Sequence, residues 1–284
     1  GKPLPKSIRE ICGGVKATEA QSAVAESLAD AENSLLLLGN IAGRHEAFSA
    51  VRALAAAICA LTGATFGTVS QGANSAGLSL AGVLPHRRAG GVARDEAGLN
   101  AGEMLDASLD AVLLLDIEPD ADLADAESVS KLSRQGFVIA LTPFVSEALL
   151  ETADLLLPVG TFAETSGTYV NVAGTWQSFG GIASPVGEAR PAWKVLRVLG
   201  NLVEADGFEY VTSDDVLEEA RKQIGDVEAD NSYKGSGKIA APNGADAPSA
   251  EIDVPLYSVD SVVRRARALQ LTVEARRAAE GDAS

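Results

Sequence analysis

The sequence is poor in the residues that build most catalytic centres. Its 284 residues include only two cysteines, Cys12 and Cys59, and two histidines, His45 and His86. It has no CxxC, HExxH, GxSxG or GxGxxG segment, which argues against a cysteine-ligated cluster in this chain, a zinc or serine hydrolase and a nicotinamide dehydrogenase. Unpatterned cysteines favour a reducing compartment. Cys59 stands among small apolar residues of a predicted helix, so we expect it to pack in the core.

Positive charge and long apolar runs are also scarce. Lysine and arginine total 23 against 39 aspartates and glutamates, a formal net charge of -16. This balance argues against a nucleic-acid partner and against an anionic membrane surface for the body of the protein. No apolar run reaches the length of a membrane span, and no signal peptide opens the chain. The sequence begins Gly1-Lys2-Pro3 without Met, which we interpret as a processed or recombinant piece of a longer protein.

Strand and helix patterns alternate through the first two thirds of the chain. Predicted strands lie at 35–38, 65–70, 111–115, 137–141 and 155–157, and predicted helices lie at 15–33, 48–62, 122–133 and 145–152. The unbroken apolar runs at 111–115 and 155–157 are typical of strands buried on both faces. Gly63 is the expected end of the second helix. The alternation predicts an α/β fold with a doubly wound, mostly parallel sheet.

The last third of the chain changes character. A hairpin is predicted about Ala173-Gly174, a helix from Pro191, and a helix at 213–224 with Ser213 as its N-cap. We therefore divide the chain into an α/β domain (1–224), a flexible linker rich in small and polar residues (225–253), and a basic amphipathic tail (254–284). We predict one helix in the tail. Its apolar stripe consists of Val262, Ala266, Leu269 and Val273, and the arginines around the stripe are Arg264, Arg265, Arg267, Arg276 and Arg277.

The loop after the predicted strand 155–157 carries the pattern E-x-x-G-T-x-x-N-x-x-G-x-x-Q. This order resembles the nucleotide-binding domain of the molybdopterin oxidoreductase family. The resemblance implies cofactor-binding candidates at the carboxyl edge of the sheet, which are Asp116, Glu164, Gly167, Thr168 and Asn171. The sequence departs from the family at Ala173, where Glu is common, and at Thr175, where Arg is common.

The exit loop of the strand 111–115 is also unlike a cofactor site. It presents Asp116, Glu118 and Asp120, and these carboxylates would repel a diphosphate. We therefore regard the five cofactor-binding candidates as vestigial. We expect no catalytic residue, no metal ligand and no bound cofactor in this chain.

Three further segments indicate a resemblance to a more specific group of proteins. These are Gly72, Asn74 and Gly77, then Leu84-Pro85-His86-Arg87, and the tail pattern P-L-Y-x-x-D-x-x-V-R-R-A-x-x-L-Q-x-T. They resemble the large iron-sulfur subunits of the proton-pumping NADH-quinone oxidoreductase, respiratory complex I. The resemblance implies a non-catalytic structural portion that supports electron transfer from NADH to quinone. Other subunits of the peripheral arm are its expected partners, and iron-sulfur clusters are expected in upstream domains that this chain lacks. The expected location is peripheral, on the cytoplasmic side of the bacterial inner membrane or the equivalent mitochondrial matrix side.

Two alternatives stay open. The chain could be a fragment of an oxidoreductase that uses a molybdopterin guanine dinucleotide, such as a formate dehydrogenase, with the nucleotide across Asp116, Glu164, Thr168 and Asn171. It could also be a free-standing nucleotide-binding module, although it lacks a fingerprint for one. For the tail, we expect docking on its own domain or on a neighbouring subunit, and no direct membrane insertion, because the acidic body is repelled by anionic lipid.

Overall fold

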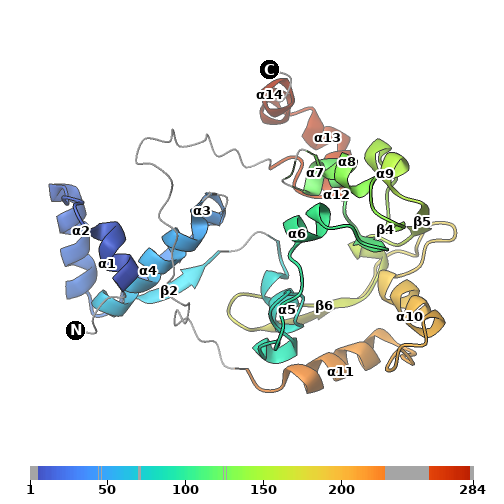
Figure 1. Ribbon diagram of the computed structural model, residues 1–284, viewed down its shortest axis with the longest axis horizontal. Coiled ribbons are helices and arrows are strands. Elements are labelled where there is room, and N and C mark those ends of the chain that lie inside the picture. Colours follow the sequence, from blue (N-terminus) through green and yellow to red (C-terminus); the bar gives the residue numbers. More distant parts are fainter. Residues whose placement is uncertain are drawn as a thin grey trace. The chain divides into compact units, whose positions relative to one another are not determined.

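The computed structural model describes residues 6–43, 45, 47–69, 72–123, 125, 127–227 and 256–281. The chain divides into two compact units (Figure 1). Among the described residues, unit 1 comprises those within 6–75 and 172–175, and unit 2 comprises those within 76–171, 176–227 and 256–281. Most of the linker predicted at 225–253 lies outside the described residues.

Unit 1 is built on a pair of parallel strands. Its elements are α1 (Lys6–Cys12), α2 (Glu19–Asp30), β1 (Leu35–Leu38), α3 (Asn40–Gly43), α4 (Phe48–Thr62) and β2 (Thr65–Thr68). The two strands pair in register, Leu35 with Thr65 and Leu38 with Thr68. Helix α2 begins at Thr18, whose hydroxyl accepts from the Gln21 backbone N–H at 3.3 Å while the Gln21 side chain accepts from the Thr18 N–H at 2.9 Å. Gly63 ends α4 with φ of 80°, as predicted.

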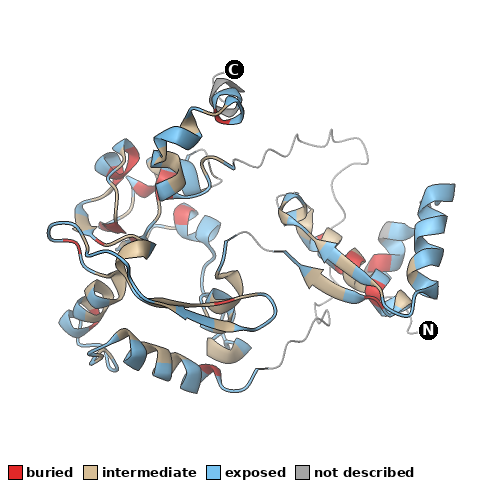
Figure 2. Cartoon of the chain, turned by 180° about the vertical axis from the view of Figure 1, so that it is seen from behind, coloured by how far each residue is buried: buried red, intermediate tan, exposed pale blue. Residues whose placement is uncertain are grey.

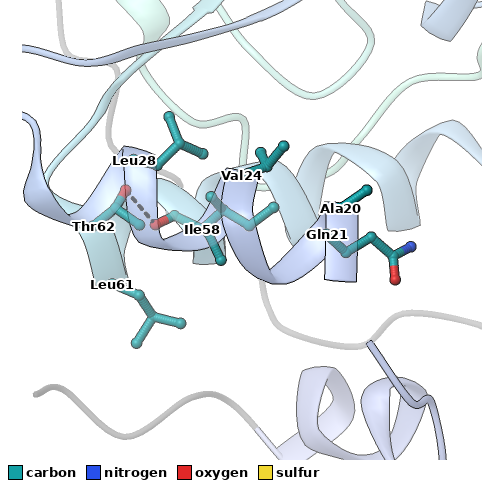
Figure 3. Close-up of a pocket in the computed structure, with 8 residues that line it drawn as sticks. Ala20, Gln21, Val24, Leu28, Ile58, Leu61 and Thr62 are labelled. Carbon is teal, nitrogen blue, oxygen red and sulfur yellow. Dashed lines mark hydrogen bonds between the residues drawn. The ribbon is translucent and has the colours of Figure 1, made fainter. Parts of the chain in front are cut away.

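Helices α2 and α4 pack against each other around an apolar cavity of about 490 Å³ (Figure 3). The cavity is lined by Ala20, Gln21, Val24, Ala25, Leu28, Ile58, Leu61 and Thr62. None of these lining side chains ionises, so the cavity offers no acid, base or charged ligand. Cys59 is buried in α4, as expected from the sequence, and burial raises the pKa of its thiol. The thiol therefore has the character of a core residue.

Unit 2 contains the three-stranded parallel sheet that positions the candidate site. The elements that follow β2 as far as this sheet are α5 (Ser75–Leu80), η1 (Ala89–Gly91), α6 (Ala101–Asp106), β3 (Val112–Leu115), α7 (Pro119–Asp122), α8 (Ser128–Leu132), β4 (Val138–Thr142), α9 (Glu147–Thr152) and β5 (Leu155–Pro158). The strand order is β3-β4-β5, with β4 in the centre. The core cluster consists of Leu105, Leu114, Leu132, Val138, Ala140 and Leu149, and Figure 2 shows buried segments in these strands and helices.

The register of the sheet corrects the prediction that its outer strands are buried on both faces. Leu114 pairs with Ala140 and lies in the core, 6% exposed. Its neighbour Leu113 is 47% exposed and pairs with Ile139, which in turn pairs with the exposed Leu155. Successive side chains of a strand point to opposite faces. The described helices therefore cover the Leu114 face of the outer strands and leave their other face partly exposed.

The rest of unit 2 consists of a hairpin and helices. Its elements are η2 (Phe162–Glu164), β6 (Gly167–Val170), β7 (Trp176–Phe179), α10 (Ala192–Leu202), α11 (Ser213–Ile224), α12 (Ser261–Arg265), α13 (Arg267–Gln270) and α14 (Val273–Gly281). Strands β6 and β7 are antiparallel, and the turn between them contains Gly174 at φ of 82°. The predicted α/β fold with parallel sheets, a small hairpin and C-terminal helices is thus confirmed, with the parallel strands in two separate sheets.

Three predicted helices differ in their details. The helix predicted at 122–133 is two short helices, because Leu123 is extended after α7. The predicted tail helix is broken after α12, where Ala266 has φ of -75° and ψ of 90°. The N-cap of α11 is Thr212 and not Ser213: its hydroxyl accepts from the Asp215 N–H at 3.2 Å, and the Asp215 carboxylate accepts from the Thr212 N–H at 2.8 Å. Local capping bonds decided this last boundary.

Candidate functional site

The candidate site is the carboxyl edge of the β3-β4-β5 sheet, the edge at which open α/β folds place their ligands. Asp116 follows β3 with φ of 51°, and its backbone N–H donates to the Leu141 carbonyl at 2.8 Å. Glu118 follows two residues later and precedes α7. At the end of β4, the Thr142 hydroxyl accepts from the Phe144 N–H at 3.2 Å. The edge thus presents carboxylates from the β3 exit and an aromatic ring from the β4 exit.

The C-terminal tail lies on this edge. The N-cap of helix α12 is Asp260, whose carboxylate accepts from the N–H groups of Val262 and Val263, each at 2.8 Å. Directly after this N-cap, the Ser261 hydroxyl donates to Asp116 at 3.4 Å. Ser261 is buried. The first turn of α12 therefore contacts the residue that immediately follows β3.

Two adjacent arginines of α12 form ion pairs with the acidic segment 116–122 that follows β3. Arg265 donates two hydrogen bonds to the Glu118 carboxylate, at 2.7 and 3.1 Å. Arg264 donates two to Asp122, at 2.9 and 3.1 Å, and its Nη2 also lies 3.3 Å from Glu118 Oε1. Both contacts are bidentate forks, the strongest common geometry for an arginine and a carboxylate. We call this set of contacts the tail clasp.

Burial strengthens the tail clasp. Glu118 is only 6% exposed, and a buried carboxylate needs a paired charge because leaving water costs it several kcal/mol. The guanidinium of Arg265 also lies over the Phe144 ring, 4.5 Å from its centroid. Burial lowers the pKa of Arg264, but the hydrogen bonds and charges of Asp122 and Glu118 outweigh this effect and raise it above its ordinary value. Arg264 is therefore fully charged at physiological pH.

Asp116 is the one vestigial candidate within the tail clasp. Burial is the main reason that its pKa is raised, and the charges of Asp122 and Glu118 add to the increase. The hydrogen bond from Ser261 and the charge of Arg264 act in the opposite direction. Asp116 thus binds a proton more readily in the folded chain than in the unfolded one.

The other vestigial candidates make contacts within their own loop and hairpin. Glu164 accepts from the Thr161 N–H at 2.8 Å and from its hydroxyl at 3.0 Å, which caps η2. Thr168 shares a hydrogen bond of 2.9 Å with Ser178 across the hairpin. A Cβ at Gly167 would lie 2.8 Å from the Phe179 ring, so glycine permits the strands to close. Asn171 follows β6 and is half-buried. Each side chain with a described role serves local structure.

Sequence reasoning identified the acidic loop and the arginines separately and did not pair them. From the sequence, Glu118 is predicted to repel a diphosphate and Asp122 to begin a helix. The sequence patterns indicate no role for Phe144 and Ser261. The available signal was the alternation of carboxylates at 116–122 opposite an Arg-Arg pair in an otherwise acidic chain. The predicted apolar stripe of the tail is also corrected, because Val262, Leu269 and Val273 are exposed. Ser261 and the two arginines make the described polar docking contacts.

Metal-ligand clusters and membrane-spanning helices are both absent from the described residues. No group of three or more His, Cys, Asp or Glu side chains there is arranged to hold a metal ion. Within the same part of the chain, no helix combines the length and apolarity needed to cross a membrane.

Residues 13–202 match the family model for molybdopterin oxidoreductases. The match covers well over half of the sequence, and the chain therefore belongs to the molybdopterin oxidoreductase family. The tail clasp lies partly outside the matched region, since α12 follows it in the sequence.

Relatives with different activities show comparable similarity. The chain is 29% identical over 174 residues to the assimilatory nitrate reductase catalytic subunit of Bacillus subtilis, covering 58% of this chain and 24% of that protein. It is 27% identical over 202 residues to a subunit of the NADH-quinone oxidoreductase of Salmonella typhimurium, covering 69% of this chain and 21% of that protein. It is 30% identical over 131 residues to the F420-dependent formate dehydrogenase subunit alpha of Methanocaldococcus jannaschii, covering 44% of this chain and 19% of that protein. The chain thus spans about a quarter or less of the length of these relatives.

Proposed function

We propose that this chain is a non-catalytic structural portion of the large iron-sulfur subunit of NADH-quinone oxidoreductase. The tail clasp is the observation that carries this proposal. It holds the C-terminal segment on the carboxyl edge of the β3-β4-β5 sheet, where a ligand of an open α/β fold would lie. A segment of the protein itself therefore fills the position of a ligand at the β3 exit.

The charges at this edge support a scaffold role. A guanine nucleotide carries phosphates that need cationic or N–H partners. The guanidinium groups of Arg264 and Arg265 already donate to Asp122 and Glu118. A diphosphate would have to break these forks and then lie beside the carboxylates of Asp116, Glu118 and Asp122, at an electrostatic cost.

In the proposed role the chain supports the assembly of the peripheral arm that carries electrons from NADH to quinone. Its partners are other subunits of that arm, and it lies on the cytoplasmic or matrix side of the membrane. The iron-sulfur clusters belong to other domains of the full subunit. The similarity to the NADH-quinone oxidoreductase of Salmonella typhimurium, which covers 69% of this chain, supports this assignment.

The test combines assembly with cofactor content. The chain is co-expressed with the other arm subunits and purified through a tag on a partner subunit. We expect co-purification, no stoichiometric molybdenum by mass spectrometry, and no guanine nucleotide released on denaturation. Failure to co-purify, together with stoichiometric molybdenum or nucleotide, would contradict the scaffold role.

The second candidate function is a fragment of an oxidoreductase dependent on a molybdopterin guanine dinucleotide. The similarity to nitrate reductase and formate dehydrogenase subunits favours it. In this case the nucleotide would lie across Asp116, Glu164, Thr168 and Asn171. Calorimetric titration with GDP separates the two candidates: saturable binding that is lost in Thr168→Val supports the enzyme fragment, and the scaffold role predicts no binding.

A further inference from the structure

The acceptor side of the tail clasp is a surface made of residues within 116–144, outside the tail. It consists of Asp116, Glu118, Asp122 and Phe144, and we call it the arginine-pair surface. The Asp122 carboxylate is oriented by the Glu118 N–H, which donates to it at 2.7 Å. The buried Ser128 hydroxyl donates to the Pro119 carbonyl at 2.8 Å and holds α7 in place. These bonds lie within 116–144, so the surface is organised before an arginine arrives.

The ligand side of the tail clasp is also organised by its own residues. Asp260 caps the first turn of α12, and the Gln270 side chain donates to the carbonyls of Tyr257 and Val263 at 2.7 and 2.9 Å. Residues 257–270 are thereby tied into one short folded segment. A segment with its own caps and internal bonds loses less conformational entropy when it binds.

The geometry of the two sides is selective for adjacent arginines. Neighbouring residues on a helix point about 100° apart, so an Arg-Arg pair needs two separate acceptors. Glu118, which precedes α7, and Asp122, its last residue, supply them: each guanidinium makes a bidentate fork with one of the two carboxylates, and Arg264 also lies 3.3 Å from Glu118. Phe144 adds an aromatic face beneath Arg265. Lysine keeps the charge but lacks the planar fork and so cannot make the same bidentate contacts.

The described contact depends on polar groups and little on the apolar stripe of the tail. Val262, Leu269 and Val273 stay exposed. Nothing in the chemistry of the tail clasp therefore requires that the two sides belong to the same molecule.

We propose that the arginine-pair surface is a recognition site for an N-capped helix bearing two adjacent arginines, and that it binds this segment from a second copy of the chain as well as from its own. Binding in trans places the second molecule's Arg264 and Arg265 on Asp122 and Glu118. In one molecule the chain's own tail competes for the surface at high effective concentration, so the surface accepts a second molecule when its own tail is released.

The test uses a fluorescent peptide of residues 256–277 and full-length protein. The acceptor is R264A/R265A, whose own tail lacks both guanidinium groups, and circular dichroism checks that it is folded. We expect saturable binding by fluorescence anisotropy, with affinity at least about tenfold weaker for the wild-type chain because its own tail competes. Adding E118Q/D122N to the acceptor is expected to weaken binding by about tenfold or more, since both forks are lost.

A matched peptide with lysine at positions 264 and 265 controls for charge alone. We expect it to bind several-fold more weakly than the arginine peptide. Binding that E118Q/D122N leaves unchanged would overturn the proposal, as would the absence of binding to folded R264A/R265A. No arm subunit or cofactor takes part in this experiment, so its outcome is independent of the proposed scaffold function.

Discussion

At the scale of single residues, Glu118 connects the fold to the candidate site. It is buried, and the described guanidinium groups near its carboxylate belong to Arg265 and Arg264. Removing Glu118 would leave the partly exposed Arg265 without its carboxylate, while Arg264 would keep Asp122 as a partner, so we expect the cost to lie between that of a surface pair and that of a fully buried pair. The position of the tail is therefore expected to depend on this side chain.

We predict that Glu118→Ala lowers the free energy of unfolding by about 1–3 kcal/mol, because a partly buried charge-assisted fork is lost. Asp120→Ala is the matched control: Asp120 is an exposed carboxylate of α7, two residues after Glu118, and we expect a change within about 0.5 kcal/mol. Urea denaturation of both variants at pH 7 measures the difference. Equal effects of the two substitutions would show that the Glu118 fork contributes little.

Asp116 yields a prediction of pH dependence. Burial raises its pKa above the ordinary value of 3.8. Its contribution to stability is therefore fully present below that value and is lost as pH rises through the folded-state pKa. We predict that Asp116→Asn, which is neutral and tolerates the positive φ, is more stable than wild type at pH 7.

Denaturation at several pH values between 7 and 4 tests this sign. The advantage of Asp116→Asn is expected to shrink as pH falls towards the ordinary value of 3.8, because the carboxyl of the folded wild-type chain takes up its proton above that value. A variant that is less stable than wild type at pH 7 would mean that the ionised Asp116 is favourable in the folded chain.

At the scale of elements, the start of β4 depends on a close backbone approach. A Cβ at Gly136 would lie 2.3 Å from the Asp110 carbonyl oxygen, and the Gly136 N–H donates to Leu109 at 2.8 Å. We predict that Gly136→Ala destabilises the fold by about 1–3 kcal/mol, as overpacking does. Gly180→Ala is the control, because open space surrounds that position. The Tm values of the two variants should differ by several degrees. Similar Tm values would show that the loop 109–111 can shift easily to make room for the added Cβ.

At the scale of the whole molecule, the tail distinguishes protein docking from lipid binding. The net charge of -16 repels anionic lipid, while the arginines of α12 are already paired within unit 2. We predict that R264A/R265A weakens co-purification with the arm subunits and leaves liposome flotation unchanged. R276A/R277A removes the same charge from exposed positions of α14 and should affect neither. Flotation that falls in R264A/R265A while assembly stays intact would identify the tail as a membrane anchor.

The sequence by itself determined the parts of this protein that depend on near neighbours. Apolar runs and the breaks between them located β1 to β5, Gly63 and Gly174 located a helix end and a turn, and the order of residues after β5 indicated the family that the match over 13–202 shows. These features follow from periodicity, backbone conformation and capping within a few positions. The N-cap at Thr212 was missed because two neighbouring hydroxyls, Thr212 and Ser213, are equally suited to the role.

Only the tertiary structure decided which charges meet and which faces are covered. The fork between Arg265 and Glu118 joins positions 147 residues apart, and any of the 39 acidic residues was a possible partner in the sequence. The exposed faces of Leu113 and Val262 likewise depend on which helices lie over them, because an apolar pattern reports what a segment can bury and not what is there to cover it. Long-range pairing and coverage are properties of the assembled chain, and these place the tail on the carboxyl edge of the sheet.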